Sequence, residues 1–370
     1  MKLTVLQENL AEALSTVTRV VSSTGSLPVL SNVLLEASEG RLKLAATDLE
    51  TGVVSWVGAQ VEEEGSITVP AKVFSRLVSN LSPGEISLEL EKQILKLTAE
   101  DVESEFNGLS ADEFPNLPEL EEENAFELSG DILSAGLDQV IFAAATDEGR
   151  PVLTGVLFCG SGDELTLVGV DGFRLAEKKL DLEQEIPDLD VIVPARTLRE
   201  LALLIGKIEE PVKVSQAEED NQLVFQVEDV CFSSRLLEGE FPDYQEIIPD
   251  EYATRFVFSR EEFLNSVSLS SIFSQVAANI VRLELSPDED QTKILANTQE
   301  IGSSTVDLAG DGEGEEVKIA FNAKYLSDCL SALSCEEVSF EAAGSLKPAI
   351  IRPLDSDDYL HVVMPVRVQE

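Results

Sequence analysis

The chain has 370 residues, of which 44% are hydrophobic and 26% charged, and this composition predicts a folded protein with two or three domains. It carries 70 acidic residues against 26 lysines and arginines, so the formal net charge at pH 7 is −44. Such a surface excludes uniform adhesion to nucleic acid or to anionic lipid. A local basic patch stays compatible with it, because salt screens charges that lie more than about 8 Å apart.

The sequence predicts a cytoplasmic protein without a cofactor or a metal. No apolar run approaches the roughly 20 residues that a membrane-spanning helix needs, and the first residues lack the apolar stretch of a signal peptide. Cys159, Cys231, Cys329 and Cys335 are scattered along the chain and form no C-x-x-C pair. We therefore expect buried or idle thiols in a reducing compartment rather than disulfides or a zinc site.

The predicted elements run as helix, strands, helix and strands within each third of the chain. Apolar residues recur at helical spacing over residues 6–20, and again over residues 71–81. Residues 86–90 and 95–98 alternate between apolar and polar, which is typical of half-buried antiparallel strands. Two helices against a mostly antiparallel sheet make an α+β domain, and we expect three of them.

Several landmarks recur at nearly constant spacing, which indicates an internal repeat. Two landmarks recur after 123 residues: Pro28–Leu34 returns as Pro151–Leu157, and Asp48 returns as Asp171. A third, Glu113–Asn116, returns as Glu240–Asp243 after 127 residues. A weaker third copy is seen where helices are expected to begin, at Val69–Lys72, Val193–Arg196 and Phe321–Lys324. The repeats predict domains at residues 1–122, 123–250 and 251–370.

Positive charge is concentrated in the second helix of each repeat, predicted at residues 71–81, 195–207 and 323–333. These segments hold six cations, Lys72, Arg76, Arg196, Arg199, Lys207 and Lys324, but two acids, Glu200 and Asp328. In the first of them, Lys72 and Arg76 lie one helical turn apart, opposite an expected apolar stripe of Val73, Leu77 and Leu81. The pattern indicates either a surface for a polyanion or ordinary solvated helix faces.

No catalytic residues are predicted. The single histidine, His361, lies in an apolar run, which favours a packed side chain over a base. Gly160–Asp163 lacks the strand-to-helix context of a nucleotide-binding loop, and Asp311–Glu316 lacks the ligand pattern of a calcium loop, so we expect an acidic surface loop there. With 70 acids, paired carboxylates carry no information.

Five motifs in order resemble one family over the whole chain. They are Ala46–Glu50, Arg150–Gly155, Asp171–Ala176, Glu240–Tyr244 and Val363–Arg367. Together they resemble the bacterial replication sliding clamp, the β subunit of DNA polymerase III. The resemblance implies a DNA-clamp fold, with six domains of a head-to-tail homodimer forming a ring. Such a ring encircles duplex DNA without reading its sequence and tethers the replicative polymerase for processive synthesis. It is not an enzyme itself.

The resemblance also implies three groups of site residues. A groove between the second and third domains would bind peptides of the polymerase, the clamp loader, repair polymerases and other partners, through Leu153, Val170, Gly172, Phe173, Arg174, Leu175, Pro242, Ile247, Val362, Met364, Pro365, Val366 and Arg367. Arg174 and Arg367 would hold polar or acidic ends of the peptide. DNA-facing candidates are Lys72, Arg76, Arg150, Arg196, Arg199, Lys207 and Lys324. Candidates for the dimer interface are Phe106, Ile272 and Phe273.

Two departures from the family's usual pattern stand at Val170 and Phe173, where a threonine and often a histidine are familiar. They predict a more apolar pocket with one donor fewer. From the residues alone, an acidic scaffold that adds binding faces for proteins stays open beside the clamp, whereas nothing in the sequence supports a carboxylate-dependent hydrolase. The resemblance favours the clamp.

Overall fold

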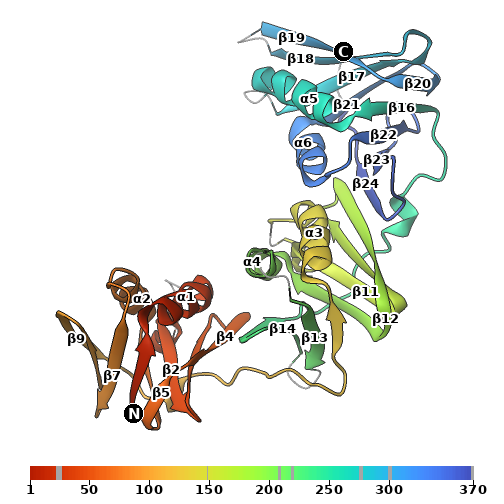
Figure 1. Cartoon of the computed structure of the whole chain (residues 1–370). Coiled ribbons are helices and arrows are strands. Elements are labelled where there is room, and N and C mark those ends of the chain that lie inside the picture. The colour runs from red at the N-terminus through yellow and green to blue at the C-terminus, as the bar shows by residue number, and fades with distance from the viewer. Residues whose placement is uncertain are drawn as a thin grey trace. The chain divides into compact units, whose positions relative to one another are not determined.

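The computed structural model describes the chain in seven segments: residues 1–21, 27–147, 149–206, 210–217, 221–274, 278–298 and 302–367. The contacts divide it into two compact units (Figure 1). The first contains Met1–Ile132 and Arg196–Leu236, and the second contains Leu133–Ala195 and Leu237–Glu370. Each unit joins strands from two successive repeats into one continuous sheet.

The first unit has two antiparallel sheets. One has the order β5 (Gln60–Glu63), β1 (Lys2–Leu6), β7 (Glu85–Glu91), β8 (Ile94–Ala99) and β9 (Val102–Asn107). The other has the order β10 (Phe126–Leu128), β13 (Val212–Ala217), β14 (Gln222–Val227), β15 (Val230–Arg235), β4 (Thr51–Gly58), β3 (Arg41–Thr47), β2 (Asn32–Ser38) and β6 (Gly65–Pro70). The predicted strands at 86–90 and 95–98 are confirmed as β7 and β8, with their apolar residues turned inwards.

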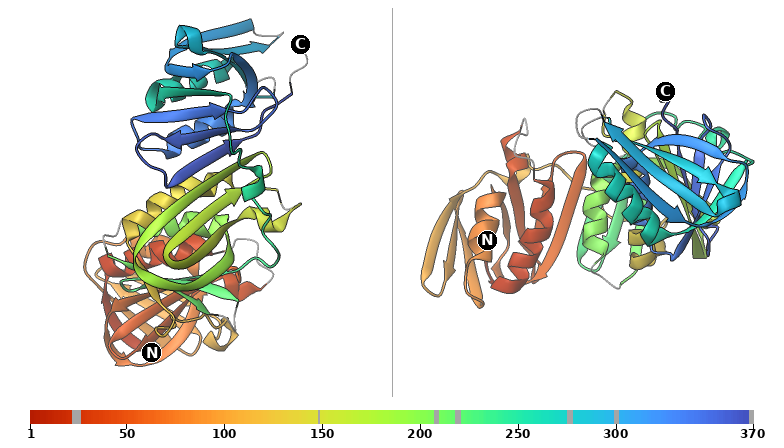
Figure 2. Two further views of the ribbon diagram at one scale, coloured as in Figure 1. Left: turned by 90° about the vertical axis from the view of Figure 1, so that its right-hand side faces the viewer. Right: turned by 90° about the horizontal axis from the view of Figure 1, so that it is seen from above.

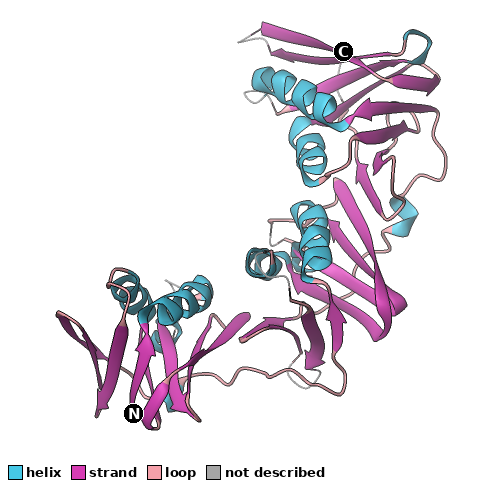
Figure 3. Cartoon of the chain, viewed as in Figure 1, coloured by secondary structure: helices cyan, strands magenta, loops and turns pink. Residues whose placement is uncertain are grey.

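Helices α1 (Gln7–Val17) and α2 (Ala71–Ser79) lie side by side in this unit (Figures 1 and 2). Figure 3 shows them in cyan against the magenta strands. The apolar stripe predicted for α2 is wrong, because the helix buries Ala71, Phe74 and Val78 instead, while Val73 is 62% exposed. In so short a helix, more than one set of apolar residues has helical spacing, so the sequence alone does not fix which side is buried. The packing of the Phe74 ring determines the buried side.

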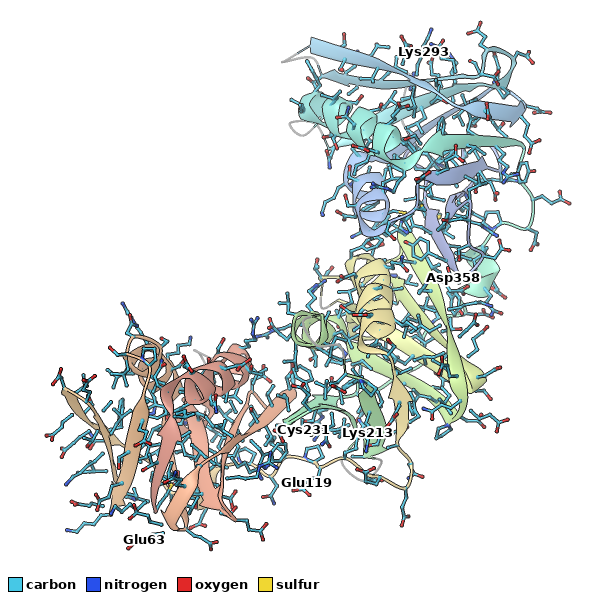
Figure 4. The ribbon with its side chains drawn as sticks, in the orientation of Figure 1. Glu63, Glu119, Lys213, Cys231, Lys293 and Asp358 are labelled. Carbon is cyan, nitrogen blue, oxygen red and sulfur yellow. The ribbon has the colours of Figure 1, made fainter. Side chains whose placement is uncertain are left out.

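The acidic segment after the first repeat is packed against the eight-stranded sheet. Leu117 and Leu120 contact the apolar cluster around Cys231, and the backbone N–H of Glu121 donates to Ser215 Oγ at 3.0 Å. Figure 4 shows Glu119, Cys231 and Lys213 in this region, and Lys213 forms an ion pair with Glu122 at 3.2 Å. The connection between the first two repeats is therefore held by its leucines, with its carboxylates in solvent.

The second unit also has two antiparallel sheets. The larger has the order β11 (Gly155–Val170), β12 (Arg174–Pro194), β24 (Tyr359–Val363), β23 (Ala349–Pro353), β22 (Glu337–Ala342), β16 (Thr254–Ser259) and β20 (Asp311–Gly314). The smaller has the order β19 (Gly302–Ala309), β18 (Gln291–Thr298), β17 (Ile280–Ser286) and β21 (Val317–Asn322). Helices α5 (Arg260–Ser274) and α6 (Ala323–Ala332) pack against each other (Figure 1). Helix α4 (Ala195–Ile205) belongs to the first unit except for its first residue, and the boundary between the units falls within α3 (Gly130–Val140).

The acidic loop predicted at Asp311–Glu316 is wrong in its first part, which forms the edge strand β20 paired with β16. The pairing depends on Gly312, because a Cβ there would lie 2.5 Å from Cζ of Phe256. The ring of Phe256 fills this space and stacks on Phe258 at 5.3 Å between centroids. The acids of β20 are exposed, so the predicted surface position is confirmed, whereas the predicted loop is a strand in this part.

The internal repeat is confirmed in backbone geometry. Asp48 Oδ1 accepts hydrogen bonds from the N–H groups two and three residues further on, at 3.1 and 2.8 Å. Asp171 Oδ1 does the same at 2.8 and 2.9 Å. The residue after the aspartate has positive φ in both turns, +78° at Leu49 and +90° at Gly172. The two Pro-Val-Leu segments, Pro28–Ser31 and Pro151–Thr154, are both single turns of 3-10 helix that lead into strands.

Candidate functional site

A cavity of about 200 Å³ lies in the second unit, where segments from the second and third repeats meet. Its lining consists of Arg150, Leu153, Val170, Gly172, Arg174, Leu175, Pro242, Asp243, Tyr244, Ile247, Val362 and Met364. Nine of these were predicted as groove residues from the sequence. The structure therefore brings together most of the predicted set, from four segments that are far apart in the chain.

The floor of this cavity is apolar and buried. Leu153, Val170, Leu175 and Val362 are at most 4% exposed and belong to one packed cluster. The rim differs, because Ile247 and Met364 are 42% and 39% exposed and are free to cover an incoming side chain. A small apolar depression with a pliable methionine at its edge suits the anchoring of aliphatic or aromatic side chains from varied partners.

Four predicted groove residues do not line the cavity. Phe173 is 58% exposed and stacks on Tyr325 at 6.5 Å between ring centroids, so it does not make the pocket more apolar as expected. Pro365, Val366 and Arg367 follow the last strand. The Met364 N–H donates to Phe173 O at 2.8 Å, and the Val366 N–H donates to Ala320 O at 2.7 Å. The backbone at Val366 is thus bound to the edge of β21, and Arg367 is exposed beyond it.

Arg174 has a role inside the protein that the sequence did not predict. Its side chain is 8% exposed, and its guanidinium donates to Asp171 Oδ2 at 3.0 Å, Asp328 Oδ2 at 2.6 Å and Phe142 O at 2.5 Å. The ring of Tyr325 lies 4.5 Å from the guanidinium carbon. These partners use three of the five N–H groups of the guanidinium, and the expectation that Arg174 holds an acidic end of a peptide stays a prediction. Within the protein, the side chain fixes the wall of the pocket.

The wall itself is the tight turn Asp171–Arg174. Its second position holds Gly172 at φ +90°, a conformation that glycine adopts without strain and that Leu49 adopts at +78° in the first repeat. A Cβ at Gly172 would lie 2.8 Å from Nη2 of Arg150. Arg150, which we predicted to face DNA, therefore lies at the pocket with its guanidinium close to the turn. Its Nη2 is 3.5 Å from Asp171 O, a long contact that leaves most of its hydrogen-bonding capacity unused.

Two titratable groups beside the pocket have strongly shifted pKa values. Burial raises the pKa of the Tyr244 hydroxyl, and the neighbouring Glu177 carboxylate raises it further. Burial lowers the pKa of His361 to about 3, and the nearby Arg174 guanidinium lowers it too, with partial opposition from Asp328. His361 is 0% exposed and its ring lies 5.6 Å from that of Phe142. The prediction of a packed histidine is confirmed.

The predicted DNA-facing cations lie on exposed surfaces wherever the structure describes them. Lys72 and Arg76 are exposed on α2, Arg196 and Arg199 on α4, and Lys324 on α6. Lys207 lies outside the described residues. The side chain of Arg196 is 79% exposed and 4.0 Å from Asp48, and that of Lys324 is 64% exposed. All three helices begin at the alanine that the sequence pattern indicated.

The predicted interface residues differ in their surroundings. Phe106 lies on the edge strand β9, is 8% exposed and packs edge-to-face on Phe74 at 5.1 Å between centroids. Ile272 is 60% exposed on α5, and Phe273 beside it is half-buried. Phe106 belongs to the first unit, and Ile272 and Phe273 belong to the second.

Sequence reasoning missed several residues of the pocket and its support. Asp243 and Tyr244 directly follow the Phe-Pro landmark, so a wider reading of that motif would have included them. The indication for Asp328 in the sequence was weaker, since it is one of only two acids in the basic helical segments. The other, Glu200, lies 3.7 Å from Arg19. In both cases the acid faces a cation from another element, which a single sequence does not reveal.

Comparison with known proteins places these features in a family. The N-terminal, central and C-terminal domains of the DNA polymerase III beta subunit match residues 1–118, 127–243 and 245–367. The chain belongs to this family. It is 35% identical over 389 residues to a beta sliding clamp of Synechocystis sp., with both chains fully covered. A beta sliding clamp is a processivity factor of DNA polymerase III and is not itself catalytic.

Solved structures agree with this assignment. The sliding clamp of Bacillus subtilis has a TM-score of 0.95 at 30% identity, and that of Pseudomonas aeruginosa, solved with a ligand, has 0.93 at 32%. Both matches cover all of each chain. The fold is thus that of three beta-clamp domains with mixed helices and antiparallel sheet. Within the described residues, no helix is long and apolar enough to cross a membrane.

Proposed function

We propose that the chain forms a head-to-tail homodimer that encircles duplex DNA and tethers the replicative polymerase for processive synthesis in the cytoplasm. Its domains would be residues 1–122, 123–250 and 251–370, so that two chains supply the six domains of a ring. The observation that carries the proposal is the exposure of Lys72, Arg76, Arg196 and Lys324 on the second helix of the three repeats, in a chain of net charge −44.

This charge distribution suits a protein that slides. Cations on helices attract phosphates without reading bases, so the contact is independent of sequence and weakens with salt. The acidic remainder of the surface disfavours DNA elsewhere. Retention would then come from the closed ring rather than from affinity.

The edges of two sheets supply a means of closing the ring. Strand β9 lies at one edge of the five-stranded sheet, and β19 lies at one edge of the four-stranded sheet. An edge strand offers backbone hydrogen-bonding groups to another chain. We propose that β9 of one copy pairs with β19 of its partner, with Ile272 and Phe273 packing near the junction. Two such junctions close a head-to-tail dimer.

The pocket beside Arg174 is the proposed docking site for the polymerase. The clamp loader, repair polymerases and other clamp-binding proteins would use the same site. Each would place apolar side chains of a short peptide over Leu153, Leu175 and Val362, with Met364 closing over them. The exposed guanidinium of Arg150, which lies close to the turn that contains Arg174, would meet a polar or acidic group of the peptide.

Solution mass and DNA retention test the proposal. Light scattering at micromolar concentration should give about twice 40.2 kDa. The dimer loaded on closed circular DNA should stay bound in salt that removes it from open DNA, and linearising the circle should release it. Loss of the dimer from intact circles as fast as from linear DNA would refute encirclement. A monomer that binds peptides but not DNA would favour an acidic scaffold.

A further inference from the structure

One carboxylate, that of Asp328, is shared by a cation of the pocket and a cation of the exposed helix surface. Its Oδ2 accepts from Arg174 Nη1 at 2.6 Å and from Lys324 Nζ at 2.9 Å, and its Oδ1 accepts from Lys324 at 3.0 Å. Arg174 is 8% exposed, whereas the side chain of Lys324 is 64% exposed. Lys324 can therefore leave this carboxylate for a ligand in solvent, and Arg174 cannot.

The same guanidinium holds the wall of the pocket. Arg174 Nε donates to Asp171 Oδ2 at 3.0 Å, and Asp171 Oδ1 accepts the backbone N–H groups of Phe173 and Arg174. An unbroken series of charge-assisted bonds thus runs from Lys324 through Asp328 and Arg174 to the turn at Asp171. Gly172 and Arg174 of that turn line the cavity.

We propose that Asp328 couples polyanion binding at α6 to peptide binding in the pocket, so that each favours the other. The proposal rests on the proposed function, in which Lys324 faces DNA and the pocket holds a partner peptide. When a phosphate draws Lys324 away, Asp328 keeps one cation instead of two. The ion pair between Asp328 and Arg174 then becomes stronger, because Lys324 no longer shares the carboxylate. The turn at Asp171 is therefore held more firmly in its peptide-binding form.

The coupling free energy cannot exceed the free energy of the ion pair between Lys324 and Asp328, which the polyanion breaks. Lys324 and Asp328 form an i,i+4 pair on a helix surface, and such a pair changes an equilibrium constant by about twofold. Duplex DNA should therefore tighten peptide binding by about twofold, and by reciprocity peptide should tighten DNA binding by the same factor. A ligand shifts the equilibrium only through such differential interaction.

The Lys324→Met variant separates this link from general charge effects, and Lys318→Met is its matched control. Lys318 lies on β21, its side chain is 68% exposed, and it pairs with Glu284 at 3.1 Å without reaching Asp328. Both variants remove one exposed positive charge. Affinities are measured by fluorescence anisotropy with a short apolar peptide selected for binding to the wild-type chain, with and without a short DNA duplex at low salt.

Without DNA, Lys324→Met should bind the peptide about twofold more tightly than the wild type, and Lys318→Met should match the wild type. With DNA, the wild type and Lys318→Met should gain about twofold and Lys324→Met nothing. Equal peptide affinity of all three proteins, or a DNA effect that persists in Lys324→Met, would overturn the coupling while leaving the proposed function intact. Absence of any DNA or peptide binding would instead overturn the proposed function and the coupling together.

Discussion

The chain's single histidine offers a direct test of the interior beside the pocket. His361 is 0% exposed, and burial together with the Arg174 cation lowers its pKa to about 3. In the unfolded chain the imidazole returns to its ordinary pKa of about 6.5. Because the pKa of His361 is lower in the folded state than in the unfolded state, the neutral ring contributes its full stabilisation of the folded state above pH 6.5. That contribution is lost as the pH falls towards the folded pKa.

The magnitude follows from proton uptake by the unfolded chain alone. Between pH 7 and pH 5 the unfolded histidine becomes protonated while the folded one does not, which lowers the free energy of unfolding by about 2 kcal/mol. The result depends little on the folded pKa, since any value well below 5 gives the same loss. Other groups also titrate in this range, so the measurement needs a matched protein in which only the histidine is absent.

Two measurements check the prediction. The ¹³C–¹H signal of the labelled imidazole should not titrate between pH 7 and pH 5. In parallel, the pH dependence of stability should be shallower in His361→Leu than in the wild type by about 2 kcal/mol over the same range. A titration midpoint near 6.5, or identical pH dependence in the two proteins, would refute a buried neutral histidine next to Arg174.

Three further substitutions test the roles assigned to single side chains. Arg174→Ala should lower the free energy of unfolding by about 3–5 kcal/mol in denaturant titrations, because it leaves Asp171 and Asp328 without their buried cation; near-wild-type stability would contradict this role. Met364→Ala should weaken binding of an apolar peptide about tenfold with unchanged stability, because it removes an apolar side chain from the rim of the pocket. Leu354→Ala, also in the second unit but away from the pocket, is the control, and equal affinity of the two variants would remove Met364 from the site. Ile272→Asp should halve the mass found by light scattering, since it places a charge in the proposed apolar junction, whereas Leu346→Asp, at a similarly exposed leucine, should not. A dimer that survives Ile272→Asp at micromolar concentration would argue against α5 as part of the junction.

Much of the fold could be predicted because the same local chemistry occurs more than once. The Pro-Val-Leu segments and the turns after Asp48 and Asp171 adopt the same backbone in both copies, since each depends on residues close together in sequence. The buried side of α2 could not be predicted in this way. Its contacts come from distant strands, and the ring of Phe74 meets Phe106 only in the folded unit.

The pocket likewise has features that depend on nearby residues in the sequence and features that depend on distant ones. Its lining followed from motifs, but the partners of Arg174 did not, because Phe142, Asp328 and Tyr325 lie far from it in sequence. An exposed arginine and a buried one look alike in a motif. The difference lies in whether other elements satisfy the guanidinium, and a buried charge without such partners would be costly. The three acceptors around Arg174 therefore explain why an arginine can stand at the wall of an apolar pocket.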